Sequence, residues 1–305
     1  MIDPKYRSQV KLLLDILPSV ADESRFALHG GTAINLFANN MPRLSVDLDL
    51  TYIPLEDRIT SLANITTALA SIKQRALTRL SPIRITHQVD KAKLICTRQA
   101  AQVKIEVNTI MRGTLGMALP MVLAPAAQEK FTAYAEIQIA PVGQLYGGKI
   151  CAALDRQHPR DLFDVDHLYK TTGITPEIKR GFLFCMLCGD GPLDEFFKPN
   201  LFDRRETMKT QFAGMTDQQF TYDEFEGARN QLIHDVNTNL SNDDRKFLIS
   251  FLSGNPAYSD HGFSDFEKYP AIQWKLQNIK KLKSANPTKH QLQLKLLAEN
   301  LNIDP

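Results

Sequence analysis

Two aspartates, Asp47 and Asp49, alternate with the apolar residues Val46, Leu48 and Leu50. This period-two pattern predicts a half-buried strand with both carboxylates on one face. If both are ionised about 5 Å apart, their repulsion is about 3 kcal/mol at an effective dielectric near 20. Binding a hard divalent cation such as Mg²⁺ relieves that repulsion. The pair alone is more typical of a solvated strand face, so it does not define a site without further residues.

The turn Gly30-Gly31 precedes this strand and stands between a short apolar segment and a helix-like segment. Glycine lets the backbone approach a ligand closely, and a helix start presents unpaired N–H groups to phosphate. The hydroxyl of Thr32 offers a further donor. A plain strand–helix turn has the same composition, so the glycine turn indicates phosphate binding only in combination with the aspartates.

A third carboxylate, Glu106, stands on the polar face of another alternating segment, residues 102–108. Three carboxylates on neighbouring strands can hold two metal ions, which activate an attacking oxygen and stabilise leaving pyrophosphate. Taken singly, Glu106 is an ordinary exposed strand residue. The combination predicts a site for Mg²⁺ and phosphate.

A second polar block begins at Lys149, within a segment of helical spacing that runs from residue 144 to residue 156. Arg156 follows Lys149 by two helical turns, so both side chains share one helix face. Arg160 and Asp161 come next, at the expected start of another helix. The structural alternatives are a solvated lysine and local surface ion pairs, which contribute little to stability.

Two other motif-like patterns favour structural roles. The stretch from Gly143 to Lys149 resembles a P-loop, but Ile150 stands where a P-loop needs a hydroxyl for magnesium. Cys185 and Cys188 form a CxxC in an apolar segment, with no second ligand pair at zinc-finger spacing. We interpret them as two core cysteines one helical turn apart.

The elements that must position these residues alternate between strand and helix in the first half of the chain. Strands are expected over residues 25–29, 45–52, 84–87, 91–97 and 102–108, and helices over 32–37, 58–80, 144–156 and 159–169. A helix starts at Asp3-Pro4 and is expected to end at Pro18. Residues up to 141 are expected to be loop and short strand, with Pro120 and Pro125 limiting any helix.

Gly173 and Pro176 mark a domain boundary, beyond which the pattern is mainly helical. The expected fold is α+β, with a mixed-sheet domain over residues 1–172 and a helical domain over 173–305. Lysines 275, 280, 281, 283, 289 and 295 give the last segment either a basic face for an RNA backbone or a solvated helix face.

Composition is that of an ordinary globular protein, with 305 residues, 43% hydrophobic residues and a formal net charge of +2. The near-neutral balance gives no global signature of nucleic-acid binding. We expect neither a membrane-spanning segment, which needs about 20 apolar residues, nor a secretory signal. Four cysteines are too few for a disulfide scaffold of this length and fit a reducing cytoplasm.

The runs Leu28-His29-Gly30-Gly31-Thr32-Ala33 and Arg43-Leu44-Ser45-Val46-Asp47-Leu48-Asp49-Leu50 resemble the nucleotidyltransferases of the AbiEii toxin family, within the DNA polymerase β-like superfold. The second block, Lys149-Ile150-Cys151-Ala152-Ala153-Leu154-Asp155-Arg156 followed by Arg160-Asp161-Leu162-Phe163-Asp164, is similar to the same family. The resemblance covers residues 25–170, and the helical remainder is compatible only in character.

The resemblance implies a role for each matched residue. Gly30, Gly31 and Thr32 would bind triphosphate, although many members of the superfold have serine where Thr32 stands. Asp47, Asp49 and Glu106 would bind two Mg²⁺ ions. Lys149 would contact triphosphate or base, and Asp161 would position Lys149 or help deprotonate the acceptor.

The resemblance also implies a reaction and partners. The chain would be a toxin of a bacterial toxin–antitoxin pair that transfers nucleotides from NTP to an acceptor, with tRNA 3′ ends as the leading acceptor and an antitoxin as partner. Nucleotidylation (AMPylation) of a protein or small molecule is an alternative. A third reading is a catalytically inactive binding module.

Overall fold

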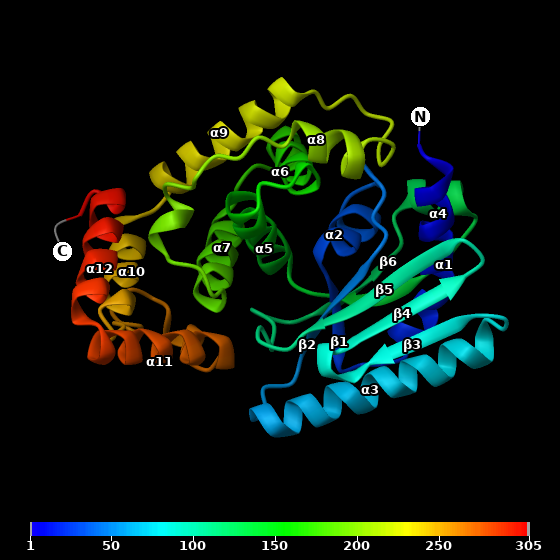
Figure 1. Ribbon diagram of the computed structural model, residues 1–305, viewed down its shortest axis with the longest axis horizontal. Helices are drawn as coiled ribbons and strands as arrows, with labels where there is room; N and C mark the ends of the chain where they lie inside the picture. Colours follow the sequence, from blue (N-terminus) through cyan, green and yellow to red (C-terminus); the bar gives the residue numbers. More distant parts are fainter. Residues whose placement is uncertain (1, 304–305) are drawn as a thin grey trace. The chain divides into compact units, whose positions relative to one another are not determined.

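The computed structural model describes residues 2–303, and the chain divides into two compact units (Figure 1). The first unit extends to Tyr146 and also includes Thr207–Phe220; the second comprises Gly147–Glu206 and the chain from Thr221 onward. The boundary expected after residue 172 lies inside the second unit, where helix α6 (Pro159–Thr171) packs against α9 (Tyr222–Thr238). The assignment of residues 1–172 as the catalytic domain stays a prediction.

The first unit is built on a seven-stranded mixed sheet with the order β3-β4-β5-β2-β1-β7-β6. Strands β1 and β7 pair in parallel, as do β2 and β5, and the other neighbours are antiparallel. The strands are β1 (Phe26–His29), β2 (Leu48–Tyr52), β3 (Arg84–Gln88), β4 (Lys93–Arg98), β5 (Ala101–Asn108), β6 (Leu119–Val122) and β7 (Glu136–Ile139). The α+β class with a mixed sheet is confirmed.

Alternation along the central strands separates a buried face from a polar one. Leu48 and Ile105 are fully buried and are register partners on β2 and β5. Asp49 and Glu106, the next residues, point to the opposite face and are only partly buried. The sequence pattern thus fixes which face of the sheet carries carboxylates.

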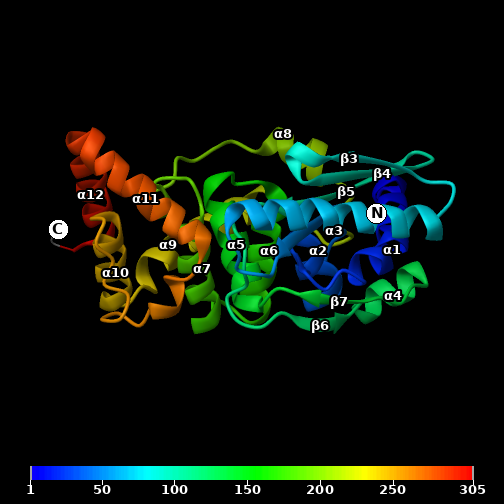
Figure 2. The same ribbon diagram turned by 90° about the horizontal axis from the view of Figure 1, so that it is seen from below.

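Helices α1 (Pro4–Ala21) and α3 (Arg58–Arg79) pack against each other and against the sheet, and Figure 2 shows α3 running along the strands. Each is capped by an aspartate: the side chain of Asp3 accepts from the N–H of Lys5, and that of Asp57 from Ile59 and Thr60. Between β1 and β2 the chain forms α2 (Gly30–Ala33), which continues as a π-helical turn, Ile34–Ala38.

Two expectations about proline were wrong. Helix α1 continues through Pro18 to Ala21, because Ser19 and Val20 remain packed in the core and a single missing backbone donor does not outweigh that burial. Helix α4 (Pro125–Phe131) forms where loop was expected, because Pro125 occupies the first turn, where no N–H is needed.

The second unit is helical around an aromatic core. Phe184 lies edge-on to Phe266 and Tyr269, and all three are buried. Besides α6 and α9, its helices are α7 (Pro176–Cys188), α10 (Asn242–Leu252), α11 (Pro270–Ala285) and α12 (Pro287–Leu301); α5 (Val142–Asp155) and the short α8 (Arg205–Thr207) cross between the units.

The cysteine pair of α7 behaves as predicted. Cys185 and Cys188 are buried free cysteines, and burial raises the pKa of the Cys185 thiol to about 12. Such a thiol stays protonated at neutral pH and is a poor nucleophile.

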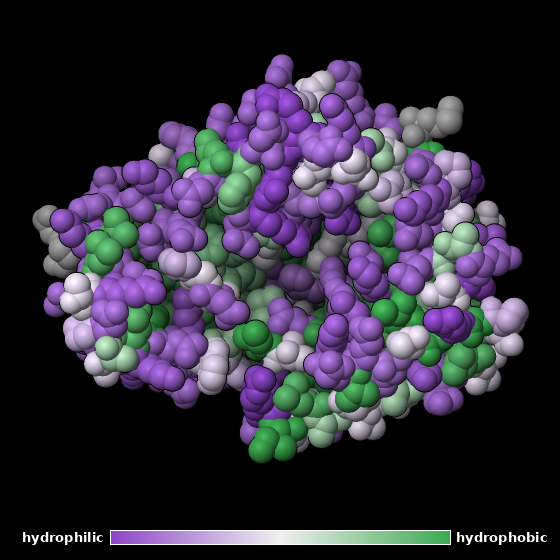
Figure 3. All heavy atoms as spheres, in the orientation of Figure 1, coloured by the Kyte–Doolittle hydropathy of each residue, from purple (hydrophilic) through white to green (hydrophobic). Residues whose placement is uncertain are grey.

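The surface is largely hydrophilic on the face shown in Figure 3, with apolar side chains in small areas, such as the one over α3. Leu55, which precedes α3, and Ile59, in the first turn of α3, are 43% and 83% exposed. Scattered exposed apolar residues of this kind are ordinary in folded proteins. Between residues 2 and 303, no helix is both long and apolar enough to cross a membrane.

Candidate active site

The polar face of the sheet carries a row of registered residues on four adjacent strands. Asp49 on β2 lies opposite His29 on β1 and opposite Glu106 on β5, and Glu106 lies opposite Lys93 on β4. Register partners on neighbouring strands have side chains on the same face, with Cβ atoms about 5 Å apart. Glu106 makes an ion pair with Lys93. The row therefore runs from a histidine through two carboxylates to a lysine.

Gly30 has no tolerance for a side chain. Its φ is +69°, in the left-handed region that favours glycine, and a Cβ built on it would collide with the carboxylate of Asp49. The backbone at the start of α2 and the Asp49 carboxylate thus lie against each other. The glycine turn and the acidic strand form one local structure.

Gly31 stands beside a cation. A Cβ at Gly31 would lie 3.1 Å from Nη2 of Arg43 and 3.0 Å from Oγ of Ser45. Arg43 is only 3% exposed and donates from Nη1 to the carbonyl of Leu44 (2.8 Å). A guanidinium held against a glycine backbone supplies positive charge where an anion would approach the turn.

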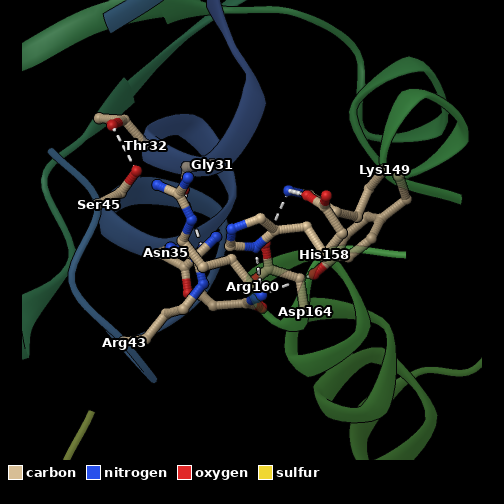
Figure 4. A network of polar contacts seen from close by, with 12 residues as sticks. Gly31, Thr32, Asn35, Arg43, Ser45, Lys149, His158, Arg160 and Asp164 are labelled. Carbon is tan, nitrogen blue, oxygen red and sulfur yellow. Dashed lines mark hydrogen bonds and ion pairs between the residues drawn. The ribbon is translucent and has the colours of Figure 1, made fainter. Parts of the chain in front are cut away.

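Thr32 has a different role from the one expected. Its side chain is fully buried, and Oγ1 lies 3.0 Å from Oγ of Ser45 and donates to the carbonyl of Asp47 (2.5 Å); Figure 4 shows the contact with Ser45. The expectation that this hydroxyl contacts nucleotide is corrected, because a buried hydroxyl with these partners does not face a ligand. Thr32 instead ties α2 to the chain that carries Asp47.

Asp47 and Asp49 offer the ligand type and number that a divalent ion takes from a protein. Mg²⁺ typically takes one or two carboxylates and completes its shell with water and substrate phosphate. Asp47 and Asp49 are both partly exposed and alternate with the buried Leu48. In the described part of the chain, no three histidine, cysteine or acidic side chains gather as a metal-binding group. Glu106 lies opposite Asp49 in the register and pairs with Lys93, and its role as a third metal ligand stays a prediction.

A separate cluster of charges lies within the second unit. Nζ of Lys149 on α5 lies 2.8 Å from Oδ1 of Asp161 and 2.9 Å from Oδ2 of Asp164, both on α6. The three side chains are 6%, 2% and 0% exposed, respectively. Lys149 and Asp164 are labelled in Figure 4. The solvated-lysine interpretation of Lys149 is therefore wrong.

Arg156 completes this cluster at its solvent side. Its Nε lies 2.6 Å from Oδ2 of Asp161, while its own side chain is 62% exposed. Burial alone would raise the pKa of Asp161, but the Lys149 ammonium and the Arg156 guanidinium outweigh burial and hold that pKa well below its usual range. Asp161 is thus an ionised, buried anchor for two cations and a weak base.

The start of α6 is fixed by His158. Its Nδ1 accepts from the N–H of Arg160 (3.1 Å), and Pro159 fills the first turn. Because α6 begins there, Asp161 and Asp164 fall three residues apart on the helix face that meets Lys149. The Gly143–Lys149 stretch is part of the continuous helix α5, so it is not a P-loop.

Sequence reasoning gave no role to Lys93, Ser45 or Asp164. Lys93 could have been found from the alternation of β4, where Leu94 and Cys96 are buried and Lys93 must face the other way. Asp164 could have been found from the helix expected over residues 159–169, because a spacing of three places it on the same helix face as Asp161.

A mixed sheet whose acidic strand abuts a Gly-Gly turn, followed along the chain by a lysine–aspartate helix pair, defines a nucleotidyltransferase. The chain belongs to the AbiEii family, described as "Nucleotidyl transferase AbiEii toxin, Type IV TA system", which matches residues 11–278. This family places it among toxins of toxin–antitoxin systems. No curated protein matches this sequence.

Solved structures that are similar to this chain include proteins from two bacteria. MenT4, the nucleotidyltransferase toxin Rv2826c from Mycobacterium tuberculosis H37Rv, aligns with a TM-score of 0.58 and 14% identity, covering 88% of this chain and 93% of its own. JHP933 from Helicobacter pylori aligns with a TM-score of 0.45 and 18% identity, covering 79% and 95%. At this identity the likeness to MenT4 supports the fold.

Proposed function

We propose that this toxin is a Mg²⁺-dependent enzyme that transfers a nucleotide from NTP to an acceptor, with the 3′ end of tRNA as the acceptor, and that a cognate antitoxin restrains it in the cytoplasm. The observation that carries the proposal is the contact between the Gly30 backbone and the Asp49 carboxylate. It juxtaposes a phosphate-binding turn and a metal-binding carboxylate, the two things that nucleotide transfer needs in one place.

Each group of the first unit has a part in this reaction. The backbone amides of Gly30 and Gly31 bind triphosphate oxygens, and the buried Arg43 guanidinium adds positive charge beside them. Asp47 and Asp49 hold the metal, and Glu106 is the proposed third acidic position. When bound, Mg²⁺ neutralises the charge that develops on phosphate oxygens and lowers the pKa of the attacking group.

The cluster of the second unit provides positioning. Lys149 is the proposed ligand for triphosphate or base, and its contact with Asp161 supports the positioning role for that aspartate. A low pKa argues against Asp161 as the base that deprotonates the acceptor hydroxyl, because a weak base takes a proton poorly.

The test is to incubate the protein with each labelled NTP, Mg²⁺ and total tRNA, and to resolve the products on a gel. Label on tRNA that depends on Mg²⁺ supports the proposal. Label on the protein fraction or on a small molecule would show that this species, rather than tRNA, is the acceptor. Calorimetry that finds no Mg²⁺-dependent NTP binding would favour a catalytically inactive binding module.

A further inference from the structure

The first unit contains a basic cleft that has no part in the site described above. It has a volume of about 520 Å³. It is lined by α1 and by the end of α4 with the residues that follow it, including Arg7, Lys11, Asp15, Lys130 and Phe131. Figures 1 and 2 both show α4 beside α1.

The cations of this cleft exceed its anions. Arg7 and Lys11 are exposed and one helical turn apart on α1, so their side chains lie on the same face, about 6 Å apart. Asp15, one turn further, is paired with Arg98. Lys130 lies 3.3 Å from Asp217, whose side chain is 57% exposed. Neither ion pair uses Arg7 or Lys11, so the two charges are available to a ligand.

Aromatic side chains accompany these charges. Phe131 lines the cleft, and Tyr134, which directly follows the cleft-lining Ala133, is 68% exposed. Cations that track a phosphate backbone beside aromatic rings that stack on bases are the two components of single-stranded nucleic-acid binding. An acidic protein segment would use the cations but would gain less from the aromatic ring of Phe131 that lines the cleft.

We propose that this cleft binds the phosphate backbone of the RNA acceptor, with Arg7 and Lys11 as its principal phosphate contacts and Lys130 as a third. The choice of RNA rests on the proposed function; the anionic character of the ligand rests on the cleft itself. Lys130 can exchange Asp217 for phosphate at little cost, because an exposed ion pair contributes at most about 1 kcal/mol.

The test measures binding without catalysis, by fluorescence anisotropy of labelled total tRNA in EDTA and without NTP, across a series of salt concentrations. Arg7→Gln combined with Lys11→Gln should weaken binding about tenfold or more. It should also reduce the slope of log K against log salt by about 1.4, from about 0.7 per phosphate contact on a single strand. Tyr134→Ala should weaken binding about fivefold, the low end of a single stacking contribution.

The matched control removes the same two residue types elsewhere in the first unit. Arg84→Gln combined with Lys91→Gln alters exposed residues at β3 and the turn after it, and it should leave both affinity and slope unchanged. Thermal melting checks that all variants fold. Equal binding of tRNA by the wild type and the Arg7/Lys11 variant would overturn the proposal, as would equal losses in both double variants.

A second probe distinguishes RNA from acidic protein. Polyglutamate of matched charge should bind the wild type more weakly than tRNA and should be insensitive to Tyr134→Ala; tighter binding of polyglutamate would assign the cleft to an acidic protein and overturn the RNA proposal. Because these measurements need no metal and no NTP, RNA binding that persists without nucleotide transfer would refute the proposed function and leave the cleft intact.

Discussion

The two charged regions of this toxin differ in burial and in charge balance. In the first unit, Asp47 and Asp49 are partly exposed, and the Asp49 carboxylate faces a bare glycine backbone. In the second unit, Lys149, Asp161 and Asp164 are at most 6% exposed at their side chains, and with Arg156 the cluster has two cations and two anions. Similar charged residue types are therefore partly exposed in the first unit and buried among their own partners in the second.

This difference in burial and charge balance indicates which role each group of charged residues can have. Partly exposed carboxylates can gain stability from an external cation, which is the role proposed for Asp47 and Asp49. In a buried and balanced cluster, contacts between the charges offset the desolvation penalty. Breaking one of these contacts leaves a buried charge without compensation. We expect substitutions in the first region to affect mainly activity, and those that remove a buried partner of Lys149 to affect mainly stability.

Asp49→Asn should give the largest effect and should sharpen the comparison. Removing a metal ligand forfeits several kcal/mol of transition-state stabilisation, so nucleotide transfer should fall by about a thousandfold or more. The melting temperature should change little, because Asp49 is partly exposed and its replacement has nearly the same shape. Incorporation of labelled NTP and calorimetric melting measure the two quantities.

Asp90→Asn is the control for that variant. Asp90 is exposed, on the turn between β3 and β4 of the same unit, and its substitution should alter neither quantity. Transfer that persists in Asp49→Asn at wild-type rate would show that the metal assignment is wrong.

Asp164→Asn should give the second largest effect, this time on folding. It deprives the buried Lys149 of a fully buried partner, and breaking a buried pair costs about 3 kcal/mol or more. Asp166→Asn on the same helix is matched to it, because Asp166 pairs with Lys170, whose side chain is 58% exposed. That control should cost less than about 1 kcal/mol. Urea unfolding measures both, and equal costs would break the comparison.

Local patterning in the sequence was enough to predict the sheet and the acidic face. Alternation assigned Asp49 and Glu106 to polar faces, and the register of β2 with β5 makes them neighbours. The prediction that Asp49 and Glu106 lie on polar strand faces was possible because side-chain direction alternates every two residues along a strand. The π-helical continuation of α2 and the whole of α4 were not predicted, since tertiary packing decides both.

The sequence did not predict which charged and polar side chains would be buried. Lys149 and Asp161 are twelve residues apart, and nothing in their spacing states that two helices will cover both. The same holds for Thr32, whose hydroxyl is equally suited to phosphate or to a backbone carbonyl until β2 is placed beside it. Desolvation depends on the assembled fold, and so do the roles that follow from it.

Gly30→Ala should affect activity more than stability. The φ of +69° costs a non-glycine residue about 1 to 2 kcal/mol, and the added methyl displaces the Asp49 carboxylate. A displacement of about 1 Å at a reacting centre costs about a hundredfold in rate. Labelled-NTP incorporation and urea unfolding should show both losses.

Gly173→Ala isolates the backbone contribution to that change. Gly173 has nearly the same φ, +67°, with no atom within 4 Å of an added Cβ. It should lose about 1 kcal/mol of stability and no activity. If both glycine variants lost activity equally, contact between Gly30 and Asp49 would not be the reason for the glycine.

The pH dependence of Asp161 should give the smallest effect and tests the charge balance of the buried cluster. Its pKa is lower in the folded state than in the unfolded chain, near 3.9. The folded state therefore binds this proton less readily, and the resulting stability is complete above about pH 5 and declines as pH falls below 4. The decline is about 1.4 kcal/mol per pH unit between the two pKa values. Urea unfolding of the wild type and Asp161→Asn between pH 6 and pH 3 should show their difference shrink by about 1 kcal/mol. A difference that grows at low pH would mean that burial, rather than Lys149 and Arg156, sets the ionisation of Asp161, and the cluster could no longer be described as balanced.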